Sequence, residues 1–455
     1  MKKILALALV FLLLASMTVA AQITYNTGFM IQNLSDQPAN VRVIFYDKNG
    51  NQVGSDHPYT IPAGGSQNVF PLPDDIPAGF DGSVVISSDQ PVAAVVNELG
   101  NTDQYQASYV GFSAGASTVY LPRIDRNNGG NNTWFNVQNA GTAPAQVTVT
   151  YTPGVAGSAT TETATIPVGA AKTFDQAGNT ALGSRFAGSA KVVCTNGQNI
   201  VATCNVVSAS YLMAYDGFTG GSTELSMPLV NYQPAKGLVT GIKIMNIGSV
   251  NTTVTVHYVP AAGIPGNATS PVDETHEIPA GQSVNFAYPF FSPGGTYPTK
   301  FVGSGQVTAS GNTASQPLVA VVNQTDSTTN KASAYSAFNP ASGTEHVSFP
   351  TVMTRNGARL MYTGLNVQNV GTSATTVTIT FTPLPGRGFD TPPPQSKVVQ
   401  PGETWSLIQG DTFSTVRWVG SAVASVPAGG KIIGVCNEVA TSSIDTFMTY
   451  EGINY

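Results

Sequence analysis

Strict alternation of polar and apolar residues recurs along the chain and predicts short β-strands. Residues 146–151 and 376–381 alternate in this way, which is typical of a strand with one face buried in a core. Turn signals rich in Gly, Pro and Asn separate such segments at intervals of about ten residues. No segment has a convincing amphipathic helical pattern. The sequence therefore predicts an all-β protein.

The same order of elements occurs four times. A related opening strand stands at residues 26–33, 132–139, 240–246 and 363–369. An Ile-Pro-x-Gly turn, or a looser version of it, follows at residues 61–64, 166–169, 278–281 and 399–402. A repeat of roughly a hundred residues is a whole domain, because solenoid and propeller units run about 20 to 50 residues. About seven short strands in that length predict a β-sandwich of immunoglobulin-like type.

The N-terminal segment has the features of an export signal. Lys2 and Lys3 precede an unbroken apolar run at residues 4–14, and small residues at 18–21 suit cleavage. The apolar run is shorter than the about 20 residues that a membrane span needs, and no later segment reaches that length without polar interruption. We therefore expect a secreted, extracellular or cell-surface protein without a transmembrane segment in its mature chain.

These patterns give an expected organisation of four tandem immunoglobulin-like β-sandwich domains after a cleaved signal peptide. The expected boundaries are residues 1–21 for the signal peptide and residues 22–118, 119–224, 225–346 and 347–455 for the four repeats.

A family resemblance rests on the turn that follows the opening strand. Residues 137–149 and 367–379 carry the order Val-x-Asn-x-Gly, and a second alternating strand follows. This order resembles the opening of CARDB-like and related immunoglobulin-like domains of secreted and cell-surface proteins of bacteria and archaea. The third copy keeps Asn246 and Gly248, and the first copy lacks the Gly. The resemblance implies an adhesion, spacer or stalk module, and it supports the fold class more than the function.

Composition and charge narrow the range of partners. Charged residues make up 10% of the chain, against about 25% in typical soluble proteins. The formal net charge is −6, and the 19 basic residues form no cluster. Nucleic acid and anionic lipid are bound through basic patches, so neither partner class is expected. Self-association or binding to cell-surface components is expected instead.

Three cysteines leave two interpretations open. Cys194 and Cys204 lie in the two arms of a predicted hairpin and are close enough in sequence for a disulfide bond. Cys204 and Cys436, however, occupy the position that Val96 and Val322 fill in the other copies. A position that accepts Val or Cys is typical of an apolar core, where a free thiol acts as a small hydrophobic group.

Two further repeated features are interpreted as scaffold. A Ser follows an aromatic-x-Gly step at positions 83, 189, 304 and 421, and no His or acidic residue recurs at a fixed offset to activate it. From this step we expect a hairpin in each repeat, such as residues 84–86 paired with 92–97. A Tyr ends each copy at positions 109, 215, 335 and 450. Core packing is favoured over a carbohydrate-stacking surface for these rings.

No motif predicts a metal, cofactor or catalytic site. The four histidines have no ligand spacing, and the acidic segment 273–277, which contains His276, is interpreted as a solvated loop. Residues 125–131 are interpreted as a turn, because they lack the later Glu of a calcium-binding loop. Carboxylates that meet only in space are not excluded, so a hydrolase is kept as a minor hypothesis.

The copies are linked by three strands that end in Pro, at residues 119–122, 225–228 and 347–350. Three such strands for four domains leave one terminal domain a strand short. An incomplete sheet exposes unpaired N–H and C=O groups that accept a strand from another chain. We expect any assembly junction to involve Gln22, Ile23, Thr24 and Tyr25, or Gly452, Ile453, Asn454 and Tyr455. The alternative is an edge strand whose absence the fold tolerates.

The leading functional hypothesis is a non-enzymatic extracellular structural protein. It would form a filament, coat or stalk, with strand addition between subunits as one route. The alternative is a secreted adhesin or a module that binds carbohydrate or protein through loops at the ends of the sandwiches.

Overall fold

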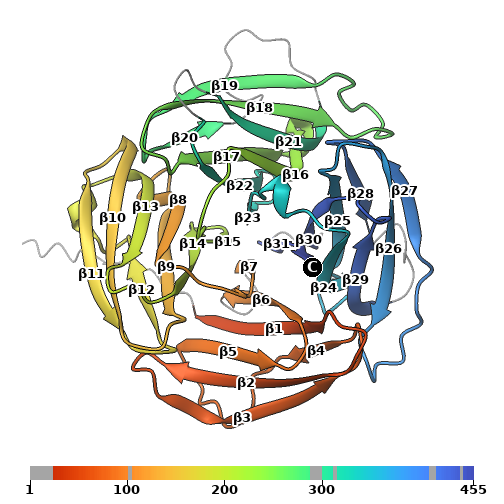
Figure 1. Ribbon diagram of the computed structural model, residues 1–455, viewed down its shortest axis with the longest axis horizontal. Helices are drawn as coiled ribbons and strands as arrows, with labels where there is room; N and C mark the ends of the chain where they lie inside the picture. Colours follow the sequence, from red (N-terminus) through yellow and green to blue (C-terminus); the bar gives the residue numbers. More distant parts are fainter. Residues whose placement is uncertain (1–23, 101–104, 287–299, 311–314, 409–416, 441–443) are drawn as a thin grey trace, which may run out of the picture.

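The computed structural model describes residues 24–100, 105–286, 300–310, 315–408, 417–440 and 444–455 (Figure 1). Within these residues the protein is all-β, as the alternation of residues predicts. Its only helical turns there are three short 3-10 segments, η1 (Thr180–Leu182), η2 (Pro234–Lys236) and η3 (Pro340–Ser342). The described part of the chain has no helix of the length and apolar character that a membrane span requires.

The strands fall into four consecutive groups, one for each repeat. The first repeat contains β1 (Tyr25–Asn33), β2 (Ala39–Asp47), β3 (Gln52–Ile61), β4 (Ser66–Val69), β5 (Gly82–Ser88), β6 (Val92–Gly100) and β7 (Tyr105–Val110). The second contains β8 (Thr118–Arg126), β9 (Asn132–Asn139), β10 (Ala145–Ala156), β11 (Thr160–Ile166), β12 (Ala171–Asp175), β13 (Phe186–Cys194), β14 (Ile200–Val207) and β15 (Leu212–Asp216).

The other two repeats follow the same plan. The third contains β16 (Glu224–Gln233), β17 (Leu238–Asn246), β18 (Thr252–Pro260), β19 (Val272–Ile278), β20 (Ser283–Phe286), β21 (Phe301–Ser310), β22 (Leu318–Asp326) and β23 (Lys331–Ser336). The fourth contains β24 (His346–Thr354), β25 (Tyr362–Asn369), β26 (Thr375–Pro383), β27 (Gln395–Val399), β28 (Thr404–Ile408), β29 (Trp418–Ser425), β30 (Ile432–Val439), β31 (Phe447–Glu451) and β32 (Ile453–Asn454).

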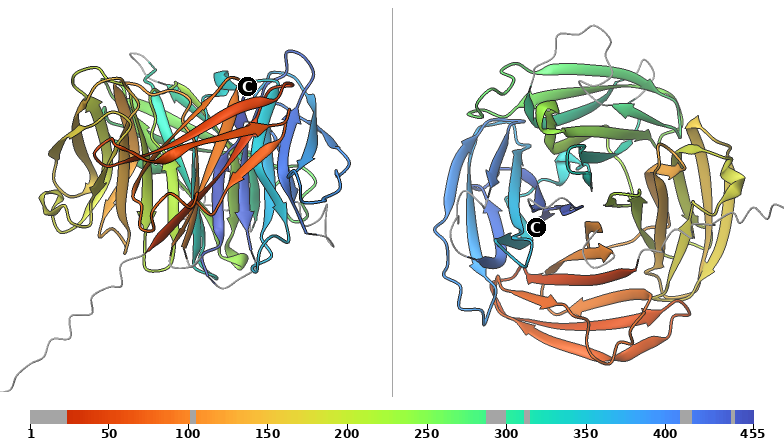
Figure 2. Two further views of the ribbon diagram at one scale, coloured as in Figure 1. Left: turned by 90° about the horizontal axis from the view of Figure 1, so that it is seen from below. Right: turned by 180° about the vertical axis from the view of Figure 1, so that it is seen from behind.

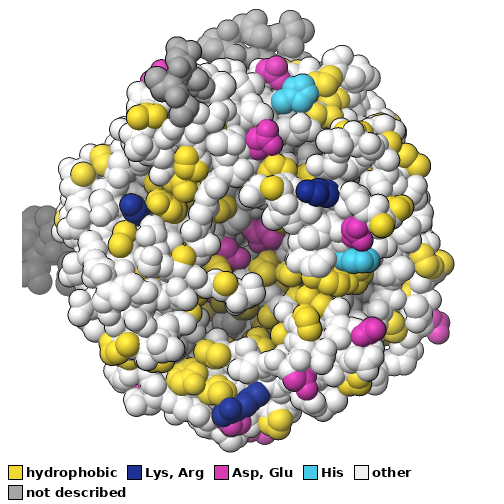
Figure 3. Space-filling view, in the orientation of Figure 1, with side chains coloured by type: hydrophobic (Ala, Val, Ile, Leu, Met, Phe, Trp, Pro, Cys, Tyr) yellow, Lys and Arg dark blue, Asp and Glu magenta, His cyan; other side chains and the backbone are white. Residues whose placement is uncertain are grey.

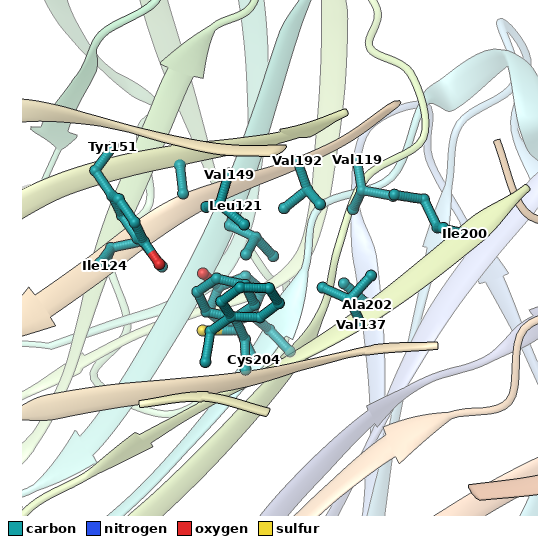
Figure 4. Packing of buried hydrophobic residues seen from close by; sticks show 14 of the residues in the cluster. Val119, Leu121, Ile124, Val137, Val149, Tyr151, Val192, Ile200, Ala202 and Cys204 are labelled. Carbon is teal, nitrogen blue, oxygen red and sulfur yellow. The ribbon is translucent and has the colours of Figure 1, made fainter. Parts of the chain in front are cut away.

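Each repeat has an inner and an outer antiparallel layer with an apolar core between them. In the second repeat the inner order is β12-β9-β14-β15 and the outer order is β11-β10-β13-β8. The third repeat differs in that β16 also pairs with β17, which joins its two layers into one sheet. Figure 4 shows side chains from both layers of the second repeat meeting in the core, among them Val119 and Leu121 of β8 and Cys204 of β14.

The four repeats form a ring around a central axis (Figures 1 and 2). The last strand of each inner layer, β7, β15, β23 or β31, lies nearest the axis. β7 packs against β15 and β31, and β23 packs against the same two strands. The first repeat therefore contacts the fourth, and the ring is closed. The sequence predicted four domains in a row but contained no signal for this closure.

The predicted hairpins after the aromatic-x-Gly-Ser steps are wrong. β5 belongs to the outer layer of the first repeat and β6 to the inner layer, and β13 and β14 are separated in the same way. β13 lies between β10 and β8 in its sheet, and β14 lies between β9 and β15 in the other, so the two strands do not pair with each other. The turn between them crosses from one layer to the other.

This crossover also decides between the two interpretations of the cysteines. Cys194 lies in the outer layer and Cys204 in the inner layer, and both are free and buried, as is Cys436. The possible disulfide between Cys194 and Cys204 is not formed. The thiols fill apolar positions, as the equivalence of Cys204 with Val96 indicates.

The repeated aromatic-x-Gly step packs a ring beside a strand crossing. Phe186 stands edge-on to Tyr151 at a centroid distance of 6.4 Å, and the other three copies have an equivalent pair. A Cβ at Gly188 would collide with the carbonyl oxygen of Thr152 on the paired strand. The glycine is therefore required by close approach of two backbones, as predicted.

In two of its four copies the repeated serine bonds to the neighbouring repeat, whereas Ser189 and Ser421 have no hydrogen-bond partner within the described residues. Ser304 Oγ donates a 2.6 Å hydrogen bond to the carbonyl oxygen of Gly402, in the turn of the next repeat, and Ser83 donates likewise to Gly169. Gln368 Nε2 donates to the same Gly402 oxygen at 3.1 Å. The repeated serine and the Pro-x-Gly turn thus meet at two seams of the ring, between the first and second repeats and between the third and fourth.

Candidate interaction site

The connecting strands complete the outer layers of the last three repeats. β8 pairs with β13, β16 with β21 and β24 with β29, so each connector belongs to the repeat that follows it. Each inserts three apolar side chains into the core at equivalent positions: Val119, Leu121 and Ile124; Leu225, Met227 and Val230; Val347, Phe349 and Val352.

A β-bulge interrupts each connector at its proline. In β8 the register against β13 shifts between Leu121 and Ile124, around Pro122 and Arg123. Equivalent shifts surround the prolines of β16 and β24. Proline has no N–H for a sheet ladder, and a bulge is one of the few places in a strand that accept it.

The repeated closing tyrosine binds this bulge. The Tyr215 hydroxyl donates to the carbonyl oxygen of Arg123 at 2.6 Å and accepts from its N–H at 3.3 Å. Tyr335 binds both groups of Leu229, and Tyr450 both groups of Thr351, in the same way. All three rings are buried, so the core-packing interpretation of these tyrosines is confirmed.

Two backbone bridges fix the connector at other points. Ala116, just before β8, pairs with Ile200 at the start of the inner strand β14, and Tyr120 within β8 pairs with Phe218 after the closing strand. The third and fourth repeats have equivalent pairs, Ser222 with Leu318, Ser226 with Phe338, Thr344 with Ile432, and Ser348 with Ile453.

The first repeat has no connector among the described residues. Its outer layer has the order β3-β2-β5, so the outer edge of β5 has no partner strand there. Val84 and Ile86 of β5 are partly exposed, whereas the residues at the same positions of β13, Ala190 and Val192, are buried. Among the described residues, the terminal repeat that is a strand short is therefore the first, and its incomplete edge exposes apolar side chains.

The tyrosine hydrogen bonds and backbone bridges that hold a connector in the other repeats have no counterpart in the part of the first repeat that the structure describes. Tyr109 pairs in register with Val96, as Tyr215 does with Cys204, yet its hydroxyl makes no hydrogen bond within the described residues. Val92 and Phe112, which correspond to Ile200 and Phe218, have no bridge there either. We call the surface formed by β5, Tyr109, Val92 and Phe112 the acceptor groove.

A buried polar network lies at the seams near the axis. The Asn that follows the Val or Cys position contacts the preceding repeat at each seam: Asn205 donates to Glu98, Asn323 accepts from Arg123, Asn437 accepts from Gln324 and Asn97 donates to Glu438. Burial raises the pKa of Glu98 to about 7 and that of Glu438 to about 8. The sequence signal for this network is a polar residue repeated in a nearly apolar strand, and it was not among the predicted site residues.

The axial strands also need acceptors for their backbone N–H groups, because each is the last strand of its sheet. Asp445 accepts from Leu212 N at 2.8 Å, Ala332 N at 3.1 Å and Gln106 N at 3.4 Å. Asp216 accepts from Val110 N, and Glu451 accepts from Ser336 N. These carboxyl groups accept hydrogen bonds from backbone N–H groups that have no neighbouring strand to pair with.

Asp216 and Glu451 line a hollow of about 370 Å³ at the axis, to which all four repeats contribute. Figure 3 shows acidic side chains gathered near the centre of the ring. Burial raises the pKa of both groups, and the charge of Glu451 adds to the shift of Asp216. On the side of the first repeat the hollow is lined by Gly111 and by Val92, which also belongs to the acceptor groove.

The predicted junction residues lie at different places. Gln22 and Ile23 are outside the described residues, Thr24 precedes β1 and Tyr25 is its first residue. Ile453 and Asn454 form β32, which pairs with β24 of their own repeat, and Tyr455 stacks on His346. Gly452 lies between β31 and β32.

The acidic segment with His276 is a strand, not the predicted loop. It forms β19, which pairs with β18 at the outside of the third repeat, and its largely exposed side chains explain its polarity. Across the pair of strands β18 and β19, His257 Nδ1 lies 2.5 Å from Asp273 Oδ1. Within the described residues no group of three or more His, Cys, Asp or Glu side chains is arranged to hold a metal ion.

Comparison with known proteins gives no family. No protein-family model matches the chain, and no curated protein matches it.

Proposed function

We propose that the protein is a secreted, non-enzymatic structural component of the cell surface, built from immunoglobulin-like sandwiches. It joins a filament, coat or stalk by accepting a strand from a neighbouring chain. The observation that carries the proposal is the acceptor groove of the first repeat. The other three repeats fill the equivalent place with a connector of their own.

The energetics support strand addition at this edge. An unpaired edge with exposed apolar residues is a liability for a protein outside the cell, and native proteins usually blunt such edges with charge or proline. β5 carries neither: its sequence is Gly-Ser-Val-Val-Ile-Ser-Ser. Main-chain hydrogen bonds to an added strand supply affinity, and pockets for alternate side chains supply specificity.

The C-terminal part of the predicted junction is less suited to this role. Ile453 and Asn454 already pair with β24, so donating them to another chain would expose the edge that they cover. The proposal therefore places the junction at β5 and its surroundings.

The test is a variant that fills its own groove. A second copy of residues 116–131, which comprise β8 and its turn, is placed before Asn26, the residue equivalent to Asn132. The producing cells secrete either this variant or the natural chain, and the extracellular material is fractionated by size and viewed by negative-stain electron microscopy. We expect the natural chain in high-mass assemblies and the self-complemented variant as free particles.

A matched control separates groove filling from the mere presence of an extension. In the control the added copy carries Ser at the positions of Val119, Leu121 and Ile124, which removes the apolar anchors. It should assemble like the natural chain. The same size distribution for the natural chain and the self-complemented variant would contradict the proposal.

A further inference from the structure

We infer that the acceptor groove takes an extended segment with the pattern apolar-x-apolar-Pro-x-apolar from another polypeptide, and that Tyr109 binds the residue after its proline. This inference rests on the proposed strand addition and names the kind of strand that is accepted.

The template for this pattern is the protein itself. The three connectors share it as Val119 to Ile124, Leu225 to Val230 and Val347 to Val352, with proline always in fourth place. The first, third and sixth side chains of each are buried in the core of their repeat. The residues at positions two and five vary among Tyr, Ser, Arg, Leu and Thr. We therefore expect the groove to select no particular side chain at these two positions.

The core of the first repeat has partly exposed apolar side chains that an added strand would cover. Its buried cluster is built on β1, β2 and neighbouring segments, with Phe29, Ile31, Val43 and Phe45 as members. Phe80, Val84, Ile86, Val92 and Val96 are packed against that cluster but are only partly buried. In the second repeat Val119, Leu121 and Ile124 complete the same layer and are fully buried (Figure 4).

The proline requirement follows from the tyrosine. In each complete repeat the tyrosine hydroxyl binds both the N–H and the C=O of the residue after proline. A strand in regular register would use those two groups in the ladder, so the bulge is what turns them toward the ring. Tyr109 stands at the same register position and lacks this partner within the described residues.

The test uses two peptides with the sequences of residues 116–126 and 344–354 of this chain, each labelled with fluorescein. Their binding to the purified mature protein is followed by fluorescence anisotropy. Both peptides should bind saturably, although they share only the pattern. A Leu121→Ser change in the first peptide should weaken binding about tenfold or more, because one buried anchor is lost.

Two protein variants locate the binding site. Tyr109→Phe should weaken binding several-fold through loss of the hydroxyl. Tyr105→Phe is the matched control: it removes a hydroxyl from the same strand, but one that bonds to Ala209 of the second repeat at 2.9 Å, and it should leave binding unchanged. The self-complemented variant should bind neither peptide, because its groove is occupied.

Absence of saturable binding by both peptides would overturn the inference. Equal binding to the self-complemented variant, or indifference to Leu121→Ser or Tyr109→Phe, would overturn it as well. The peptide-binding result does not depend on whether the protein assembles at the cell surface. Peptide binding together with unchanged extracellular material would refute the proposed structural role and leave the specificity of the groove standing.

Discussion

The side-chain amide of Asn97 donates a 3.2 Å hydrogen bond to a carboxyl oxygen of Glu438, across the seam where the first repeat meets the fourth. The two residues are far apart in sequence, and their contact is part of what closes the ring. Glu438 is fully buried, and no cation pairs with it among the described residues. A neutral carboxyl group is therefore favoured at this position.

Ring stability should fall as the pH rises through neutrality. Burial raises the pKa of Glu98 to about 7 and those of Glu438 and Asp445 to about 8, above their values in the unfolded chain. Each group favours the folded state fully below its unfolded pKa and loses that contribution as the pH rises to its folded pKa. The loss is about 1.4 kcal/mol per group and pH unit within that window.

We therefore expect a higher melting temperature at pH 5 than at pH 8.5 in differential scanning calorimetry. Glu438→Gln should flatten this dependence, whereas Glu224→Gln, an exposed control, should keep it. A melting temperature that rises between pH 5 and pH 8.5 would show that these carboxyl groups are ionised in the folded ring.

Loss of the seam serine should weaken the contact between the third and fourth repeats. Ser304→Ala removes the 2.6 Å bond to Gly402 and should lower the free energy of unfolding by about 1 kcal/mol. Ser421→Ala is the control from the same repeat position, because Ser421 Oγ has no hydrogen-bond partner within the described residues. Chemical denaturation of both variants measures the difference. Equal loss of unfolding free energy in Ser304→Ala and Ser421→Ala would mean that the bond to Gly402 contributes nothing to stability.

Replacing the axial carboxyl group should be among the most damaging changes. At pH 9, above the pKa of about 8 to which burial raises Asp445, the carboxyl group is ionised, and Asp445→Asn then leaves one acceptor oxygen for the N–H groups of Gln106, Leu212 and Ala332 and turns an amide donor toward other donors. We expect a loss of about 2 kcal/mol or more in the free energy of unfolding, typical of unsatisfied buried groups. Asp175→Asn, at an exposed position of β12, serves as the control. Unchanged stability of Asp445→Asn would show that the three strands do not depend on this acceptor.

The cysteines should be dispensable and unreactive. Burial raises the pKa of the Cys204 thiol to about 12, so it stays neutral at ordinary pH and reacts poorly as a nucleophile. Cys204→Val should change the free energy of unfolding by less than about 1.5 kcal/mol, since Val fills the same position in other repeats. Thiol titration of the native protein should show no labelling, and a reducing agent should not alter the melting temperature. A melting temperature lowered by reductant would instead indicate a disulfide.

Much of the local structure could be predicted from the sequence. The alternation at residues 146–151 marks a strand that is buried on one face, and the burial of Val147, Val149 and Tyr151 agrees with it. The equivalence of Cys204 with Val96 identified a core position. The count of three connectors for four repeats indicated a missing strand, because a shortage of a repeated element is visible without coordinates.

The partners of these elements could not be predicted in the same way. The segment after the Gly-Ser step was expected to form a hairpin, but a turn of the same length also carries the chain from the outer to the inner layer. Asn97 and Glu438 are polar residues in mostly apolar strands, and the sequence does not pair them because each is bonded by a residue of a different repeat.

The sequence by itself determined the strands, their buried faces, the four repeats and the shortage of one connector, since each depends on spacing within a short stretch of chain. Only the tertiary structure decided which sheet each strand joins, how the ring closes on buried carboxyl groups and that the incomplete edge is β5. These features depend on pairing between segments that are distant in sequence. Many strand arrangements are compatible with the same alternation of polar and apolar residues. Only one of them pairs the backbone groups and also buries the apolar faces.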